Sequence, residues 1–163
     1  MTERPDQLLF QTLYEQHQRM VLTLCRGFMK GNLDLANDLT QDVFINVWNA
    51  LPSFRGQASY KTWIYRITVN TCLLQLRREK KRSEVLLNEN IHDREAELPS
   101  DQEQKLYEVI GELEEVDRLV IMLVLEEVPY PDIAEMLGIS ENNLRVKIHR
   151  ARTKLKSRLQ HGE

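Results

Sequence analysis

The chain lacks the features of a membrane protein and of a disulfide-built scaffold. Its longest unbroken apolar run is the seven residues 119–125, whereas a membrane-spanning helix needs about 20. It has 2 cysteines, Cys25 and Cys72, which are far apart in sequence and have no CxxC partner. This favours a reducing compartment and argues against a zinc site. The N-terminal segment MTERPDQ is charged, and no charge-free apolar stretch follows it. We therefore expect no secretory signal and a cytoplasmic protein.

Signatures of catalysis are equally scarce. There is no Gly-rich phosphate loop and no nucleophile elbow, and the 4 histidines form no cluster with the cysteines. Asp34, Asp38 and Asp42 recur at i, i+4 and i+8, so a divalent cation, and with it a metal-dependent helical enzyme, stays an alternative. No histidine or further acid lies nearby to complete the coordination sphere. The sequence therefore predicts no catalytic residue, no metal, no cofactor and no small-molecule substrate.

Charge is distributed unevenly along the chain. The net charge of −3 is that of a poor nucleic-acid binder, but charge acts locally. Residues 1–83 hold 12 basic and 7 acidic side chains, whereas residues 84–100 hold 5 acids against one arginine, lose helical periodicity and end in Pro-Ser. We predict two domains, 1–83 and 101–163, joined by an acidic linker at 84–100. Within the second domain, residues 101–139 have a net charge of −9 and residues 140–163 one of +5.

The spacing of apolar residues predicts an all-α protein made of two small helical domains. The first domain is expected to contain helices over residues 10–28, 35–51 and about 60–82, the last with Ile64, Ile67, Thr71 and Leu74 facing inward. The run 119–125 suits a buried strand or a buried helix, and we favour the helix because no second strand candidate exists. The second domain also shows amphipathic spacing around 106–113, a short helix over 131–137 and a long final helix.

Residues 132–140 (DIAEMLGIS) have the pattern of a helix-turn-helix motif. Ala134 is small where two helices must approach closely, Gly138 breaks the first helix, and Ser140 is a good N-cap for the second. Asn142 and Asn143 lie in the first turn of the second helix, where their amides could reach base edges in a major groove. That helix continues with basic residues and no intervening acid: Arg145, Lys147, Arg150, Arg152, Lys154, Lys156 and Arg158. We predict DNA binding; the alternative is a solvated basic face.

A second nucleic-acid candidate interleaves aromatic and basic residues between positions 54 and 66. Aromatic faces that stack unpaired bases, beside cations that hold the backbone, are typical of single-strand binding. Its members are Phe54, Arg55, Tyr60, Lys61, Trp63, Tyr65 and Arg66. Trp63 fits the core equally well, and Asn70 fits either a buried amide or a base contact. The basic run 77–82, which begins with Arg77 and Arg78, suits both phosphates and a helix C-terminus.

An acidic helix edge predicts a protein partner. Asp38 and Asp42 share a face with Gln41, and we interpret Phe44 as an exposed apolar residue among these acids. An aromatic anchor within a polar rim is typical of a docking surface.

Several segments of the chain resemble extracytoplasmic-function sigma factors. Residues 36–44 (ANDLTQDVF), Trp48, 54–56 (FRG), 62–67 (TWIYRI), Asn70 and Arg77-Arg78 are similar to their domain 2. Leu113, 118–121 (RLVI), Tyr130, 133–140 (IAEMLGIS), 149–152 (HRAR) and Leu155 are similar to their domain 4, whereas Pro131-Asp132 departs from the usual pattern. The resemblance covers nearly the whole chain, with both domains in the expected order.

The resemblance implies an alternative sigma factor that brings RNA polymerase core to specific promoters. It implies docking on the clamp helices of the largest subunit through Asp38, Gln41, Asp42, Phe44 and Trp48, and a further contact with the β-subunit flap. It implies recognition and melting of the −10 element by Phe54, Arg55, Tyr60, Lys61, Trp63, Tyr65, Arg66, Asn70, Arg77 and Arg78. It implies reading of the −35 element by Ser140, Asn142, Asn143, Arg145, Val146, Lys147, His149 and Arg150.

The resemblance also implies control by an anti-sigma protein. Because the middle of the chain is acidic, we expect weak promoter binding by the chain alone, with polymerase holding the two domains in register. A stand-alone helix-turn-helix regulator stays the alternative; it would need neither the aromatic–basic segment nor the acidic edge.

Overall fold

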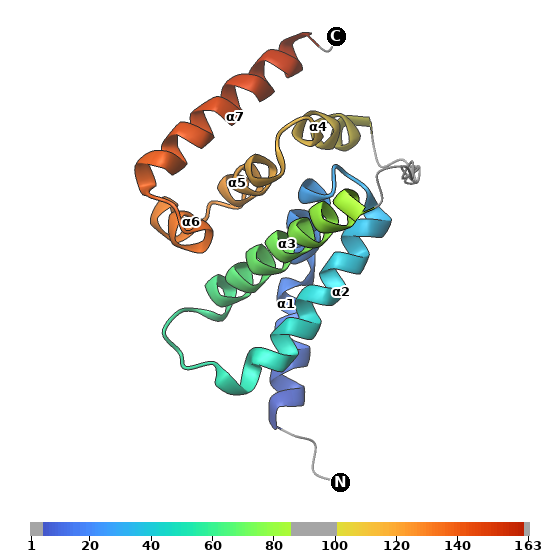
Figure 1. The fold of residues 1–163 in the computed structure, drawn as a ribbon. Helices are drawn as coiled ribbons and strands as arrows, with labels where there is room; N and C mark the ends of the chain where they lie inside the picture. Colours follow the sequence, from blue (N-terminus) through green and yellow to red (C-terminus); the bar gives the residue numbers. More distant parts are fainter. Residues whose placement is uncertain (1–4, 86–100, 162–163) are drawn as a thin grey trace.

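A computed structural model describes residues 5–85 and 101–161 of the chain (Figure 1). Its α-helices are α1 (Pro5–Phe28), α2 (Leu33–Ala50), α3 (Tyr60–Val85), α4 (Asp101–Gly111), α5 (Glu115–Leu125), α6 (Tyr130–Leu137) and α7 (Glu141–His161), with a short 3-10 helix (Leu51–Ser53) after α2. These residues contain no strand, so the all-α prediction is confirmed and the run 119–125 is helical. The predicted linker lies outside the described residues apart from its first two positions.

Helices α1, α2 and α3 form the N-terminal unit, a three-helix bundle (Figure 1). The chain turns between α1 and α2 through Gly31, whose φ of 84° suits glycine, and Asn32 caps α2 by accepting a hydrogen bond from the Leu35 N–H at 3.1 Å. Pro52 lies in the short 3-10 helix that follows α2.

The prediction for the inner face of α3 is wrong at one position. Leu74 is 42% exposed, because the buried side of α3 runs through Val69, Cys72 and Leu76 instead. The two cysteines, 47 positions apart, meet in this core as free thiols. The contact with the Cys25 thiol, together with burial, raises the pKa of Cys72 well above its usual value. Buried thiols with a raised pKa are unreactive.

Helices α4 to α7 form the C-terminal unit, and α6 and α7 make the predicted helix-turn-helix. Gly138 ends α6 in the left-handed conformation with φ of 69°. The Ser140 hydroxyl accepts a hydrogen bond from the Asn143 N–H at 3.1 Å, so its predicted role as the N-cap of α7 is confirmed. Ile133 on α6 and Leu144 on α7 are fully buried between the two helices and α5.

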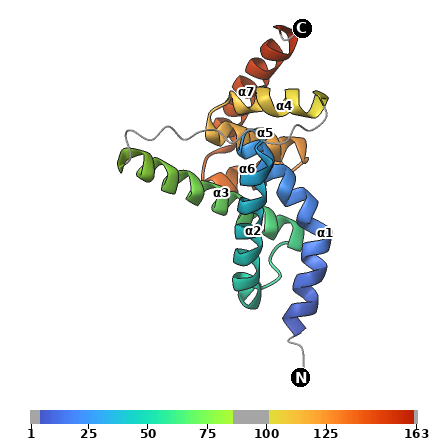
Figure 2. The ribbon, with the colours of Figure 1, turned by 90° about the vertical axis from the view of Figure 1, so that its right-hand side faces the viewer.

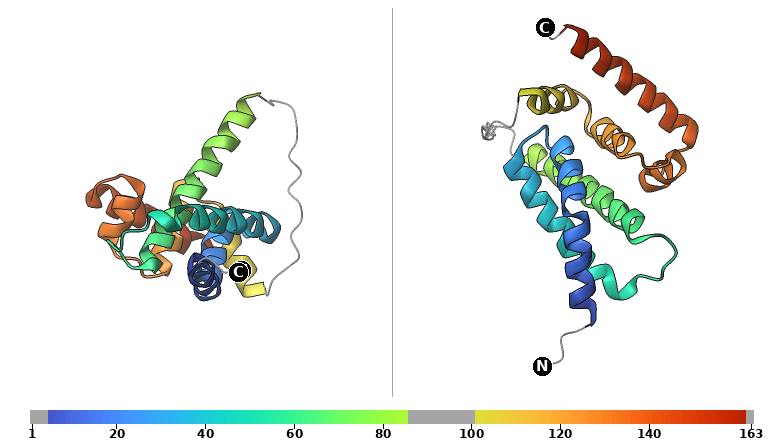
Figure 3. Two further views of the ribbon diagram at one scale, coloured as in Figure 1. Left: turned by 90° about the horizontal axis from the view of Figure 1, so that it is seen from below. Right: turned by 180° about the vertical axis from the view of Figure 1, so that it is seen from behind.

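The two units share one continuous hydrophobic core. Helices α4 and α5 pack on α1, and α6 packs on α3. Figures 1 and 3 show the C-terminal helices stacked against the N-terminal bundle, and Figure 2 shows α5 beside the end of α1. We call the contact between the two units the seam. The sequence alone does not predict the seam.

Candidate nucleic-acid and partner interfaces

The acidic edge of α2 is exposed, but its apolar residue is not the predicted one. Asp38, Gln41 and Asp42 face solvent. Phe44 is only 4% exposed, so the prediction of an exposed Phe44 is wrong. Its ring packs edge-to-face on Tyr14 of α1 at 4.8 Å between ring centroids. The long α1 covers this side of α2, which is why Phe44 turns inward.

Ile45 is an exposed apolar residue on this edge, with 56% of its surface accessible. Positions 38, 42, 45 and 49 are spaced as one helical face, and this spacing could have identified Ile45 from the sequence. Trp48 is half-buried against Phe10 of α1, with 5.3 Å between ring centroids. We call Asp38, Gln41, Asp42 and Ile45 the α2 face.

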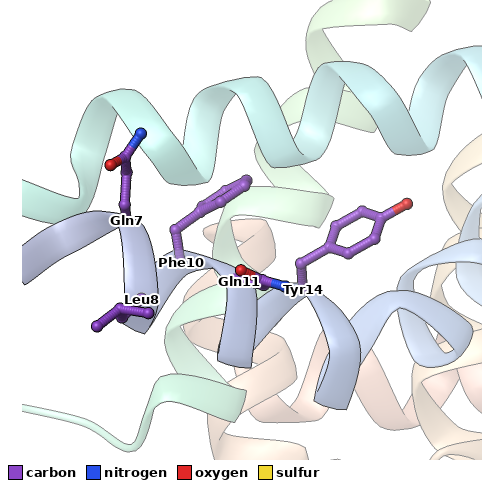
Figure 4. Close-up of a pocket in the computed structure, with 5 residues that line it drawn as sticks. All are labelled: Gln7, Leu8, Phe10, Gln11 and Tyr14. Carbon is purple, nitrogen blue, oxygen red and sulfur yellow. The ribbon is translucent and has the colours of Figure 1, made fainter. Parts of the chain in front are cut away.

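A shallow groove of about 330 Å³ lies on the first turns of α1, lined by Gln7, Leu8, Phe10, Gln11 and Tyr14. Figure 4 shows the rings of Phe10 and Tyr14 turned toward α2 and Leu8 turned away. The Phe10 ring contacts the rings of Phe44 and Trp48, and the Tyr14 ring contacts that of Phe44. The aromatic cluster therefore fixes the position of the α2 face.

The aromatic–basic segment folds into a three-ring cluster at the start of α3. The Phe54 ring stacks on Tyr60 at 4.4 Å and contacts Trp63 at 5.0 Å. All three rings are half-buried. The sequence left open whether Trp63 belongs to the core or to a base-contacting surface. In the structure it packs on the core and also keeps part of its ring exposed. Arg55 and Lys61 are exposed beside the cluster.

Tyr65 differs from the rest of this segment because it points inward. It is 3% exposed, and burial, followed by the carboxylate of Glu126, raises its pKa to about 12. Its hydroxyl has no hydrogen-bond partner among the described residues. The prediction that Tyr65 contacts DNA therefore conflicts with this structure, because the side chain of Tyr65 faces the core and the seam.

Arg66 and Asn70 lie on the outer side of α3, where the C-terminal unit meets it. The Arg66 guanidinium forms an ion pair with Glu135 of α6 at 3.3 Å. Asn70 is exposed, so the alternative in which its side chain is a buried, hydrogen-bonded amide is wrong. Both line a groove of about 160 Å³ together with Glu135 and Met136. Arg77 and Arg78 are exposed nearer the end of α3.

Helix α7 presents most of the predicted base-reading side chains to solvent. The exposed ones are Asn142, Asn143, Arg145, Val146, His149 and Arg150. Arg145 pairs with Glu141 at 3.7 Å on the same helix. Lys147 turns toward α5 and pairs with Asp117 at 3.8 Å. Ser140 is exposed, but its hydroxyl is engaged as the cap of α7.

Metal and membrane features are absent from the part of the chain that the structure describes. In residues 5–85 and 101–161 no three His, Cys, Asp or Glu side chains are grouped so as to hold a metal ion. Asp34, Asp38 and Asp42 are exposed along α2 without further acids. Over the same residues, no helix is both long enough and apolar enough to span a bilayer.

The fold and these surfaces define a class: helical DNA-binding proteins with a helix-turn-helix unit and a second, aromatic–basic candidate surface. Residues 13–82 match the family model "Sigma-70 region 2" and residues 103–155 match "Sigma-70, region 4". The chain belongs to the sigma-70 family of RNA polymerase sigma factors, in its extracytoplasmic-function group.

Curated relatives and solved structures agree with this assignment. The chain is 31% identical to RNA polymerase sigma factor YlaC of Bacillus subtilis, over 90% of each chain. It is 29% identical to the ECF RNA polymerase sigma-E factor of Haemophilus influenzae, over 97% of this chain and 91% of that one. The fold resembles sigma factor RpoE of Bartonella quintana, solved in complex with the anti-sigma factor NepR. The TM-score is 0.74 at 23% identity, over 94% of this chain and 98% of that one.

Proposed function

We propose that this chain is an alternative sigma factor that brings RNA polymerase core to a two-part promoter. The observation that supports it most is the presence, in one chain, of the exposed α2 face and a helix-turn-helix with an exposed basic helix. A stand-alone DNA-binding regulator would need only the helix-turn-helix. We further propose that residues 1–83 and 101–163 act as the two functional domains, and that the protein works in the cytoplasm, where polymerase is.

The α2 face is proposed to dock on the clamp helices of the largest polymerase subunit. Asp38 and Asp42 would meet basic side chains there, and Ile45 would supply apolar contact at the centre. Phe44 and Trp48 contribute to docking indirectly, because their ring contacts with α1 hold α2 in position. We also propose a second contact of the protein with the β-subunit flap.

The two DNA contacts are assigned to α3 and α7. At the −10 element, Phe54, Tyr60 and Trp63 offer ring faces for unpaired bases, while Arg55, Lys61, Arg66, Arg77 and Arg78 hold the backbone. Asn70 is exposed and suits a base edge. At the −35 element, Asn142, Asn143, Arg145 and Arg150 would face the major groove.

We also propose control by an anti-sigma protein. The RpoE structure contains the anti-sigma factor NepR, and a second solved structure of the same fold is CnrH in complex with the cytosolic domain of CnrY (TM-score 0.65, 24% identity). Co-purification from the host would show whether this chain has such a partner.

The proposed function is tested by adding the purified chain to core polymerase from its host and to fragmented host DNA. We expect transcripts with defined 5′ ends that share two upstream elements and that vanish when the chain is omitted. Tight duplex binding by the chain without any chain-dependent transcript would instead support the stand-alone regulator.

A further inference from the structure

The basic residues of α7 form two rows, one on each side of the stripe that this helix buries. The stripe runs through Leu144, Ile148 and Ala151. On one side of it, three basic residues recur at i, i+7 and i+11, and we call them the inner row: Lys147, Lys154 and Arg158. The same spacing on the other side of the stripe gives what we call the outer row: Arg145, Arg152 and Lys156.

All three cations of the inner row have partners within the C-terminal unit. The Lys147 ammonium lies 3.8 Å from the carboxylate of Asp117 on α5. The Lys154 ammonium donates a hydrogen bond to the backbone carbonyl of Glu112 at 2.9 Å. The Arg158 Nε lies 3.0 Å from the carboxylate of the same glutamate. The positive charge on this side of α7 is therefore engaged by the protein itself.

Glu112 engages two of these cations because of its place in the chain. It directly follows the last residue of α4, where the backbone carbonyls carry partial negative charge and have no partner within the helix. Its carbonyl accepts from Lys154, and its side chain reaches Arg158 one turn further along α7. Figures 1 and 2 show α4 beside the C-terminal half of α7. One residue therefore holds that half of α7 against α4.

The outer row is placed to contact the DNA backbone. Arg152 and Lys156 are exposed and form no ion pair within the described part of the chain. Recognition helices read bases with their N-terminal residues, so positions 152 and 156 lie beyond the base contacts. The row from Arg145 to Lys156 covers 11 residues, about 16 Å of helix, which exceeds the major-groove width of about 12 Å. Its C-terminal members therefore reach phosphates at the edge of the groove.

The acids beside the inner row oppose DNA on that side. A phosphate that approached Lys154 or Arg158 would also approach the carboxylate of Glu112, and like charges repel. Contacts with phosphates carry no sequence information, so two further free cations would strengthen binding to any duplex. An acid that engages them lowers binding to the wrong sequences more than it lowers binding to the right one.

We propose that α7 meets the backbone of the −35 duplex with its outer row, and that Glu112 determines specificity by keeping Lys154 and Arg158 away from phosphates. Glu112 acts through these two side chains and touches no DNA, so it is a positioning residue. The inference rests on the proposed function and deepens its −35 contact.

The salt dependence of duplex binding by the full chain tests the proposal. The probes are two fluorescein-labelled duplexes, one with the −35 element of a promoter selected by the wild-type holoenzyme and one with that element scrambled. Glu112→Gln keeps the carbonyl for Lys154 and an acceptor for Arg158 but loses the charge. Glu114→Gln is the matched control, because Glu114 is exposed and forms no ion pair with a described residue. Each phosphate contact adds about 0.9 to the slope of log affinity against log salt, so we expect Glu112→Gln to steepen the scrambled-duplex slope by about 1–2.

The preference of Glu112→Gln for the −35 duplex over the scrambled one should fall by about tenfold, because the released cations strengthen binding to both. The triple variant Glu112→Gln/Lys154→Gln/Arg158→Gln should return to the wild-type slope. Arg152→Gln should reduce the wild-type slope by about 0.9, whereas Lys154→Gln alone should leave it unchanged.

The outcomes separate this inference from the proposed function. If Glu112→Gln has the slope and preference of wild type, or if Glu114→Gln has the same effect, Glu112 does not hold these cations and the inference is overturned while the −35 contact stands. A wild-type chain that binds both duplexes equally would remove the proposed reading of the −35 element by α7, and the inference with it.

Discussion

Arg118 links parts of the chain 90 positions apart. It is 7% exposed, and burial lowers its pKa while Glu115 and Glu79 partly oppose that effect. A guanidinium can satisfy two carbonyls at once because its N–H groups point in fixed directions. This single side chain therefore contributes both to the C-terminal unit, through Leu113, and to the seam, through Phe28.

Replacing Arg118 should be costly. Arg118→Met removes the two hydrogen bonds and leaves two buried carbonyls unpaired, so we expect the free energy of unfolding to fall by about 3 kcal/mol. Arg118→Lys should recover only part of the lost free energy of unfolding, because one ammonium group cannot reproduce the two directed hydrogen bonds of the guanidinium. Urea denaturation measures both. Equal stability of the Met variant and wild type would show that water replaces the guanidinium at no cost.

His17 makes stability depend on pH. Burial, followed by the charge of Lys61, lowers its pKa below 6.5, so the unfolded chain binds more protons than the folded chain just below pH 6.5. The contribution of His17 is therefore complete above pH 6.5 and declines as the pH falls toward the folded-state pKa.

We expect His17→Gln to lose less stability than wild type when the pH is lowered from 7.5 to 5.5. Urea denaturation of both proteins at the two pH values isolates this difference from the titration of the carboxylates. The same loss in both proteins would show that His17 does not contribute.

At the scale of elements, α2 has two adjacent faces with different roles. One face packs on α1, and the other is the proposed docking surface for polymerase. We expect Ile45→Ser to weaken binding to core polymerase by about tenfold, as loss of a half-buried apolar side chain would, without changing the free energy of unfolding. Phe44→Ala should instead lower the free energy of unfolding by about 3 kcal/mol, because it opens a cavity beside Tyr14. Titration of labelled variants into core polymerase, with urea denaturation of each, distinguishes the two roles.

Asp42 is the polar counterpart in this test. Asp42→Asn should weaken core binding and leave DNA binding by α7 intact, since Asp42 lies outside the seam. Loss of both activities together would indicate misfolding and not a lost docking contact.

On α7, Arg145 and Lys147 differ in orientation. Arg145→Ala should weaken −35 duplex binding by about 1–3 kcal/mol if its guanidinium contacts a base. We expect Lys147→Ala to weaken it less, because the ammonium turns toward Asp117. Fluorescence anisotropy at one fixed salt concentration measures both, with Arg158→Ala, which pairs with Glu112 at 3.0 Å, as control. Unchanged affinity for Arg145→Ala would place the recognition face elsewhere on α7.

The helices and the helix-turn-helix could be predicted from the sequence because local spacing determines them. Ser140 and Gly138 act within one or two turns, and their effects are visible in the pattern. Phe44 was mispredicted because its burial depends on α1, which lies elsewhere in the sequence. Tyr65 and Leu74 were mispredicted for the same reason: each was assigned from α3 alone, whereas its surroundings come from other helices.

At the scale of the whole molecule, the shared core makes the two units one cooperative structure. We expect calorimetry of the wild-type chain to show a single unfolding transition whose van't Hoff and calorimetric enthalpies agree. The variant Gly27→Leu, whose side chain would occupy the space of Met122, should split this transition into two of lower enthalpy. Two resolved transitions in wild type would show that the units unfold independently despite the seam.

The seam was beyond prediction from the sequence for a specific reason. Gly27 and Met122 are unremarkable individually, and only their juxtaposition across about 95 positions gives them a role. An arginine such as Arg118 is ordinarily expected at the surface. The charge distribution suggested two separate basic ends, whereas Glu135 in the acidic middle forms an ion pair with Arg66 across the seam.

The dependence of α1 on α5 also has a consequence during synthesis. The N-terminal bundle leaves the ribosome first, and domains generally fold in that order. Until residues 115–125 have emerged, the surface of α1 around Gly27 has no Met122 to cover it, and the Phe28 carbonyl has no donor. The nascent protein therefore passes through a stage with an uncovered apolar strip. During that stage α3 also lacks its contact with α6.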